Sequence, residues 1–96
     1  MKVEMISKSP LEFRCTGEIE NSTDFNFLEK FISKASAAIL DLSEVSYINS
    51  CGFGALVEET MLFAEAGKEL KIRNMQENIR KTMSILGGEE LLNYID

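Results

Sequence analysis

The chain is predicted to fold as one α/β domain spanning residues 1–96, with a small mixed sheet of four to five strands, mostly parallel, and three helices. Two observations predict this class. Apolar residues recur at every second position in some segments and at helical spacing in others, and the two kinds of segment alternate along the chain. No repeat, low-complexity stretch or linker interrupts the pattern, and 96 residues suffice for one modest core.

The first two strands are expected to flank a turn that contains proline. Val3–Ile6 is short and apolar, and Ser7–Pro10 follows with turn residues; the proline lacks the N–H that strand pairing needs. Leu11–Thr16 alternates apolar and polar residues, which indicates a strand with one buried face. Gly17 ends this strand, and Ile19 is expected to return to the core.

A helix and a central strand come next. The N-cap residues of Asn21–Asp24 precede apolar residues at helical spacing, so we expect a first helix near Asp24–Lys34. Ala37–Leu42 is an almost unbroken apolar run that is too short for a helix. Such a run fits a central strand that is covered on both faces.

The second helix is expected over Cys51–Ala66, with Gly67 in the C′ position that ends it. Glu69–Arg73 then alternates with the period of a strand. Asn74 is expected to cap a third helix, which ends at Gly87–Gly88. That helix carries three apolar residues on one face: Ile79, Met83 and Leu86.

The last residues, Leu91–Ile95, are short and apolar, and we expect an edge strand or a half-turn there.

Charge and composition exclude several classes of function. The chain has 16 acidic and 10 basic residues, a formal charge of −6, which argues against binding to nucleic acid or to anionic membranes. A basic protein partner would be attracted instead. No apolar stretch reaches the roughly 20 residues that span a bilayer. The N-terminus lacks the features of a secretory signal, so a cytoplasmic location and no membrane insertion are expected.

The residue types that usually carry catalysis are scarce. Histidine is absent, and with it the commonest general base and metal ligand. Cys15 and Cys51 have no C-x-x-C spacing and are expected to be free thiols. We therefore expect a protein that is not an enzyme, with no catalytic residue, no metal and no cofactor.

The segment Asp41–Gly54 (DLSEVSYINSCGFG) is the most informative part of the chain. With the amphipathic run Ala55–Ala66 behind it, this segment indicates a buried strand, a tight polar turn and the start of a helix. A side chain at such a turn lies over free backbone N–H groups and the positive end of the helix dipole. We expect a switch or a docking point here.

Nearly the whole chain resembles the STAS domain, the family of sulfate-transporter tails and bacterial anti-sigma factor antagonists. The resemblance is carried by the combined spacing of short motifs. These are Gly17-Glu18-Ile19 with Glu20, Asp41-Leu42-Ser43, Val45, Tyr47, Asn49-Ser50-Cys51-Gly52-Phe53-Gly54, Ala64, Gly67, Leu70, Ile72, Asn74 and Leu86-Gly87.

The resemblance implies a βα superhelix around a small sheet and a role in partner switching. In the antagonists, the turn normally reads Asp-Ser-Ser-Gly-Leu-Gly or Asp-Ser-Thr-Gly-Leu-Gly. The hydroxyl residue before the first glycine takes a phosphate from a serine kinase that is itself the anti-sigma factor, and the phosphorylated antagonist releases that kinase. In this chain Cys51 occupies the phosphoacceptor position and Asn49 the acidic position. Ser50 could substitute as the acceptor, but it lies one residue early, and a shift of one helical residue turns a side chain by about 100°.

Each residue of the turn also has a structural interpretation. Gly52 and Gly54 could bind an anion, but a close turn and a tight helix–strand contact explain them better, because the lysine of a nucleotide loop is absent. Asn49 and Ser50 could hold a partner, cap the helix, or do both. Cys51 could be a reactive thiolate, yet it is more simply a small replacement for serine.

The second helix has two faces when its residues are placed every 100°. The core stripe is expected to contain Phe53, Leu56, Val57, Thr60, Phe63 and Ala64. Leu62 points nearly opposite, with Ala55 and Ala66 beside it. The solvated rim is expected to contain Glu58, Glu59 and Glu65. Small residues around an exposed leucine, directly below the turn, predict a docking face.

Three functional hypotheses follow. The first is a bacterial regulatory module that binds a serine-kinase-type anti-sigma factor. The second is an accessory subunit of a transporter ATPase or signalling complex that is not phosphorylated. The third is an enzyme or redox sensor that uses Cys51. The predicted partner-binding residues are Asn49, Ser50, Cys51, Gly52, Phe53, Gly54, Ala55, Glu58 and Leu62.

Overall fold

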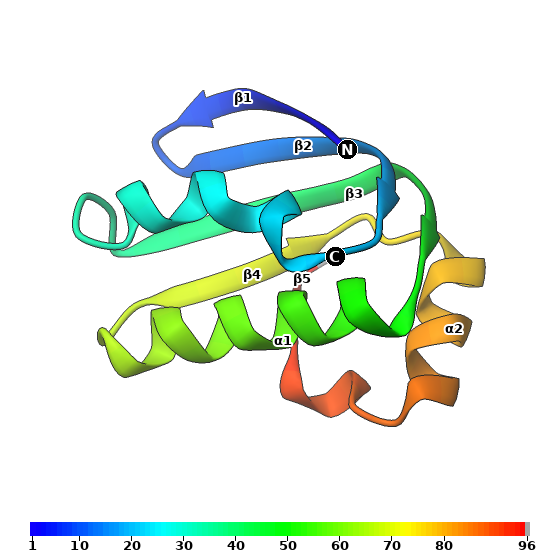
Figure 1. Ribbon diagram of the computed structural model, residues 1–96. Helices are drawn as coiled ribbons and strands as arrows, with labels where there is room; N and C mark the ends of the chain where they lie inside the picture. The colour runs from blue at the N-terminus through cyan, green and yellow to red at the C-terminus, as the bar shows by residue number, and fades with distance from the viewer. Residues whose placement is uncertain (96) are drawn as a thin grey trace.

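A computed structural model describes residues 1–95, except for the side chain of Glu89, and confirms the predicted α/β class (Figure 1). Five strands and three longer helices alternate along the chain. In order, the elements are β1 (Lys2–Lys8), β2 (Leu11–Ile19), the 3-10 helix η1 (Ser22–Phe31), β3 (Ala37–Ile48), α1 (Ser50–Glu65), β4 (Glu69–Arg73), α2 (Glu77–Leu86), the short 3-10 turn η2 (Glu89–Leu91) and β5 (Asn93–Ile95).

The strands lie in the sheet in the order in which they occur in the sequence. The order is β1-β2-β3-β4-β5, with β1 antiparallel to β2 and each later pair parallel. The predicted mixed, mostly parallel sheet is therefore confirmed. Crossovers between parallel strands are right-handed, so this sequential order directs the connecting helices to one face of the sheet.

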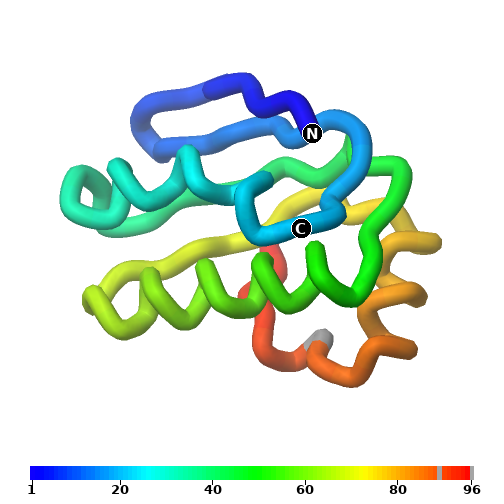
Figure 2. Tube along the Cα trace, in the orientation of Figure 1, coloured from blue at the N-terminus to red at the C-terminus, as the bar shows by residue number. Residues whose placement is uncertain are grey.

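The helices form a layer beside the sheet. Figures 1 and 2 show η1 and α1 side by side along one face, and α2 near the end where β3 leads into α1. Within residues 1–95, none of the helices has the length and apolar character needed to cross a membrane.

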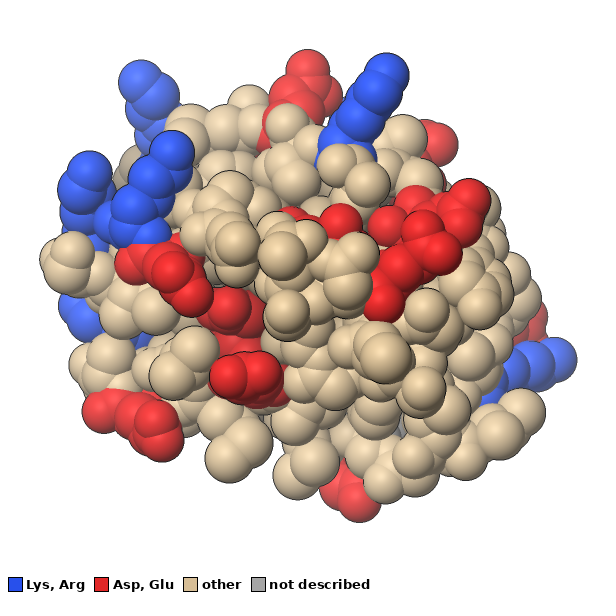
Figure 3. All heavy atoms as spheres, viewed as in Figure 1, with Lys and Arg blue, Asp and Glu red and all other residues tan. Residues whose placement is uncertain are grey.

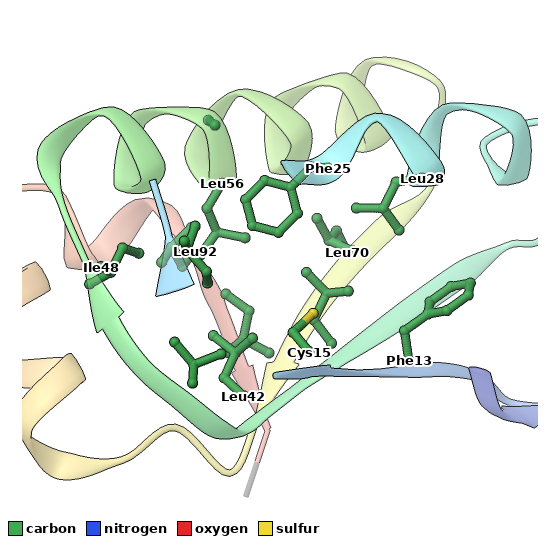
Figure 4. Packing of buried hydrophobic residues seen from close by; sticks show 14 of the residues in the cluster. Phe13, Cys15, Phe25, Leu28, Leu42, Ile48, Leu56, Leu70 and Leu92 are labelled. Atoms are coloured by element: carbon green, nitrogen blue, oxygen red, sulfur yellow. The ribbon is translucent and has the colours of Figure 1, made fainter. Parts of the chain in front are cut away.

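The core lies between this helical layer and the sheet (Figure 4). The apolar side of β2 contributes Phe13 and Cys15, and Ile19 returns to the core as predicted. The largest fully buried side chains are Phe25, Phe63, Ile19, Leu28, Leu40, Leu42, Ile48, Leu56, Leu70, Ile72, Ile79 and Met83.

The opposite face of the sheet carries paired charges. Arg73 Nη1 on β4 donates to Glu12 Oε1 on β2 at 3.0 Å, and Arg14 Nη2 on β2 lies 3.8 Å from Asp41 Oδ2 on β3. The carboxylates are buried, with 6% exposure for Glu12 and 3% for Asp41, while the arginines are partly exposed. Buried charges of this kind are tolerated when they are paired and hydrogen-bonded.

Several element boundaries differ from the prediction. The first helix is a 3-10 helix over Ser22–Phe31, not an α-helix over Asp24–Lys34, and Asn21 and Asp24 form a capping box at its start. The central strand continues to Ile48, because a shift in register lets its second half pair with Gly17–Ile19.

The start of α2 also differs from the prediction. Gln76, not Asn74, is its N-cap residue, and it makes no side-chain capping bond. Asn74 instead adopts a positive φ of 59° and donates to Asp41 Oδ2 at 3.3 Å. Of the predicted apolar face of α2, Ile79 and Met83 are buried and Leu86 is 37% exposed.

Candidate partner-binding site

The turn after β3 is held in place by Asn49. Its backbone is extended (φ −108°, ψ 179°), and its side-chain Oδ1 accepts a hydrogen bond from the N–H of Gly52 at 2.7 Å. Its own N–H donates to the carbonyl of Ile19 at 3.3 Å, which ties the start of α1 to the end of β2. The capping interpretation of Asn49 is thus confirmed, and one of the free donors at the helix start is satisfied.

Gly52 allows α1 to approach β2 closely. A Cβ added at this position would lie 2.2 Å from the carbonyl oxygen of Ile19 and 2.6 Å from its carbonyl carbon, closer than any side chain can come. The interpretation of Gly52 as a residue of tight helix–strand contact is confirmed. Gly54 is different, because a Cβ added there would meet nothing within 4 Å.

The predicted partner-binding residues divide into three groups. Ser50, Cys51, Gly54, Glu58 and Leu62 are exposed, and Asn49 is half-buried. Gly52, Phe53 and Ala55 lie in the interior, the latter two with 7% and 5% exposure, so they offer no side chain to a partner. Phe53 packs toward Gly88, where an added Cβ would lie 3.0 Å from the phenyl ring.

The buried stripe of α1 is rotated from the predicted one. Ala55 and Glu59 are buried, whereas Ala64, predicted in the core, is exposed, and Val57 is half-buried. The reason is that η1 packs along one flank of α1 and covers positions that a helix resting on the sheet alone would leave in solvent. The prediction that Glu59 belongs to the solvated rim is therefore wrong.

The outer surface of α1 is hollowed directly below the turn. The hollow has a volume of about 390 Å³, and its lining residues are Gly54, Val57, Glu58, Met61, Leu62 and Glu65. We call this surface the α1 hollow, and residues 49–54 the corner. Met61 is 55% exposed and was not among the predicted contacts. Met61 lies seven residues after Gly54, about two helical turns, so the spacing alone could have placed both residues on the same face of α1.

Both thiols are free, and their surroundings differ. Cys51 is exposed at the start of α1 and Cys15 is buried. The pKa of Cys15 is raised to about 12, mainly by burial and also by the carboxylates of Asp41 and Asp24, while the N-terminal ammonium has a smaller, lowering effect. Among the residues that the structure describes, no three His, Cys, Asp or Glu side chains are grouped as a metal site requires.

The fold and the corner together define a class of protein: a small α/β domain that presents the junction of a central strand and the following helix at its surface. The chain belongs to the STAS domain family, whose model matches residues 5–95. The resemblance inferred from the sequence is therefore confirmed. No curated protein sequence matches the chain.

Among the solved structures that share the fold are two with different surroundings for the domain. One is the anti-sigma factor antagonist SpoIIAA in its unphosphorylated form, with a TM-score of 0.69 and 15% identity over 99% of this chain and 87% of that one. The other is the overall structure of SLC26A9, with a TM-score of 0.65 and 12% identity over 86% of this chain and 17% of that one. At these identities the likeness concerns the fold.

Proposed function

We propose that this protein is a non-enzymatic regulatory module of the anti-sigma factor antagonist type, acting in a bacterial cytoplasm. It binds a serine-kinase-type anti-sigma factor through the corner and the α1 hollow. The observation that carries the proposal is the continuity of these two surfaces, since Gly54 belongs to both and its added Cβ would face open space. A partner backbone can approach closely at such a glycine.

The chemistry of the surface indicates the kind of partner that fits. Met61 and Leu62 offer apolar area in the α1 hollow, and Glu58 and Glu65 supply negative charge at its edge. Figure 3 shows acidic side chains across the face formed by η1 and α1, with basic side chains mainly toward its periphery. A partner with an apolar anchor and a basic rim would be attracted and oriented by this pattern.

Cys51 determines how the module would be switched. It is exposed at the family's phosphoacceptor position but has no hydroxyl group, so a Ser/Thr kinase cannot phosphorylate it. Ser50 is exposed as well, but it lies one residue earlier, at a different angle around the helix. We propose that release from the partner does not depend on phosphate at position 51.

The missing hydroxyl favours one alternative, a STAS accessory subunit of a transporter ATPase or signalling complex that is never phosphorylated. Both functions use the same surface and differ in the partner. The redox hypothesis is weaker, because the nearest lysines in sequence to Cys51 are Lys34 and Lys68 and no histidine exists to act as a base.

The test is purification of the tagged protein from its native cell under reducing conditions, with intact-mass analysis of the protein and its co-purifying chains. We expect an ATP-binding, kinase-like protein to be retained by the wild type and lost with Leu62→Glu. Ile85→Ser is the matched control, since Ile85 is exposed on α2 and does not line the α1 hollow. Retention of the same partner by Leu62→Glu would contradict the proposed surface.

Phosphorylation is tested separately with Cys51→Ser. This variant should fold normally and accept phosphate from the cognate kinase, whereas the wild type should not. If the kinase demonstrably binds Cys51→Ser and does not phosphorylate it, the family's switching chemistry does not apply to this corner. Co-purification of a transporter ATPase in place of a kinase would establish the alternative.

A further inference from the structure

Glu59 is a buried acid whose Oε2 atom has no hydrogen-bond donor. It lies on the flank of α1 that packs against η1 and is only 6% exposed. Its Oε2 atom is inaccessible to solvent, and no donor among the residues that the structure describes reaches it. A carboxyl group can lie in such a place cheaply only when it is neutral, since an unpaired buried charge costs several kcal/mol or more.

The charges around Glu59 increase this cost. The acidic groups that act on it are Glu29 of η1 and Glu58 of α1 itself. The ammonium of Lys30, next to Glu29, lies over the ring of Phe31, 5.5 Å from its centroid. Burial, followed by the repulsion from Glu29 and Glu58, raises the pKa of Glu59 to about 7.

η1 is the element that can move most easily in response. It keeps 3-10 geometry over ten residues, although such helices are uncommon beyond three or four residues because their hydrogen bonds are poorly aligned. Only Phe25 and Leu28 anchor it deeply in the core. α1, by contrast, is a 16-residue α-helix with seven buried residues. Local opening is expected to begin in the element with fewer buried contacts.

We propose that the contact between α1 and η1 is a proton-sensitive joint, in which η1 stays docked while Glu59 is neutral and moves outward when Glu59 ionises. Water then reaches Oε2, and the distance between the carboxyl groups of Glu59 and Glu29 can increase. The joint and the α1 hollow are both formed by α1, but the joint requires no partner. The proposal therefore stands independently of the proposed function.

The direction of the effect follows from linkage between protonation and opening. In the docked state Glu59 loses its proton near pH 7, whereas in the open, hydrated state it loses it near the ordinary value of 4.5. Raising the pH through this interval favours the open state. Between pH 5.5 and pH 8 we expect the opening equilibrium of η1 to increase on the order of tenfold or more.

Amide hydrogen exchange across this pH range tests the joint, with rates corrected for the intrinsic effect of pH. In the wild type, protection of the η1 amides should fall on the order of tenfold between pH 5.5 and pH 8, while protection of β3 and β4 changes little. Glu59→Gln, which cannot ionise, should show no such fall. Glu58→Gln is the matched control, since Glu58 is exposed on the same helix, and it should retain most of the fall.

Equal pH dependence in the wild type and in Glu59→Gln would overturn the proposal. If Glu59→Gln does not fold, titration of the wild-type carboxyl groups by 13C NMR decides. A Glu59 midpoint near 7, accompanied by shifts in the η1 amides, supports the joint. A midpoint near 4.5, or a raised midpoint with unmoved η1 amides, overturns it. Glu29→Gln should lower the Glu59 midpoint.

Discussion

Two carboxyl groups in this protein are buried to nearly the same extent, yet their pKa values shift in opposite directions. Asp41, on the charged face of the sheet, is 3% exposed, and Glu59, between α1 and η1, is 6% exposed. Burial raises the pKa of Asp41, but hydrogen bonds from Ser43 and Asn74 and the charge of Arg14 outweigh it, and the net shift is downward. Glu59 has no such partners, and its pKa rises to about 7.

The comparison shows that hydrogen-bond partners, and not burial alone, decide the charge of a group in this fold. Asp41 accepts from the N–H of Ser43 at 2.8 Å and from the amide of Asn74 at 3.3 Å. Its ionised form is therefore part of the structure of the sheet. The ionised form of Glu59 works against the packing of two helices.

The largest effect is expected from Asp41→Ala. Removing this carboxylate leaves the N–H of Ser43 and the Asn74 amide without their acceptor and the Arg14 guanidinium without its ion-pair partner, and the free energy of unfolding should fall by about 2–3 kcal/mol at pH 7. Urea denaturation measures the change. Glu44→Ala, an exposed position on the same strand, should change it by less than about 0.5 kcal/mol. Similar losses in the two variants would mean that the Asp41 network contributes little.

The stability of the wild type should depend on pH in two separate ranges. The raised pKa of Glu59 means that the folded state holds a proton that the unfolded chain has lost, so stability falls as pH rises from about 4.5 to about 7. The lowered pKa of Asp41 acts oppositely, and its contribution is lost as pH falls below the ordinary value of 3.8. Between pH 5 and pH 8 we expect a loss of about 1–2 kcal/mol. A rise over this interval would contradict the raised pKa of Glu59.

Glu59→Gln should have a smaller effect, with a sign opposite to that of Asp41→Ala. At pH 8 the free energy of unfolding of the variant should be about 1 kcal/mol higher than that of the wild type, because the cost of a buried charge is gone. The unpaired amide of the glutamine offsets part of the gain. At pH 5, where Glu59 is neutral, the gain should vanish. Chemical denaturation at pH 5 and pH 8 measures both values. An equal gain in stability at the two pH values would mean that the substitution acts through side-chain packing and not through the charge of Glu59.

The smallest effect is expected from Arg73→Met on the sheet. This change removes the 3.0 Å pair with Glu12, but the arginine side chain is 37% exposed, so solvent screens the interaction and the loss should be about 0.5–1 kcal/mol. Lys81→Met is the control, since its 3.6 Å pair with Glu77 lies in open solvent. Its effect on denaturant unfolding should be within error. A larger loss from Lys81→Met would reverse the ranking.

The parts of the fold that depend on local sequence could be predicted from it. The strand Glu69–Arg73 has the predicted bounds, because strict alternation defines both its period and its ends. Gly67 and Gly87 adopt positive φ angles of 75° and 79° at the ends of α1 and α2. This is the left-handed conformation that favours glycine after a helix. Asn49 likewise caps α1, as its position before the apolar run indicated.

The parts that depend on tertiary packing could not be predicted. Nothing in the sequence around Glu59 distinguishes it from the exposed Glu58, and its burial results from where η1 lies. The second half of β3 contains several polar residues and is a strand only because β2 continues beside it. Asn74 donates to Asp41, which lies 33 positions away in the sequence, so local sequence does not predict this hydrogen bond. Which residues of the corner are exposed depends on how α1 is rotated about its axis, and the same rotation buries Ala55. This rotation could not be predicted from the sequence.

The two glycines of the corner impose different limits on mutational tolerance. A saturation library over residues 49–54 should yield only glycine at position 52, because the carbonyl of Ile19 occupies the space of any side chain. Position 54 should accept most amino acids other than proline, which would remove a helix hydrogen bond and clash with the preceding turn, and alanine there should strengthen the helix. A fluorophore or spin label attached at position 54 would thus report on whatever approaches the helix start, while leaving the architecture beneath it intact.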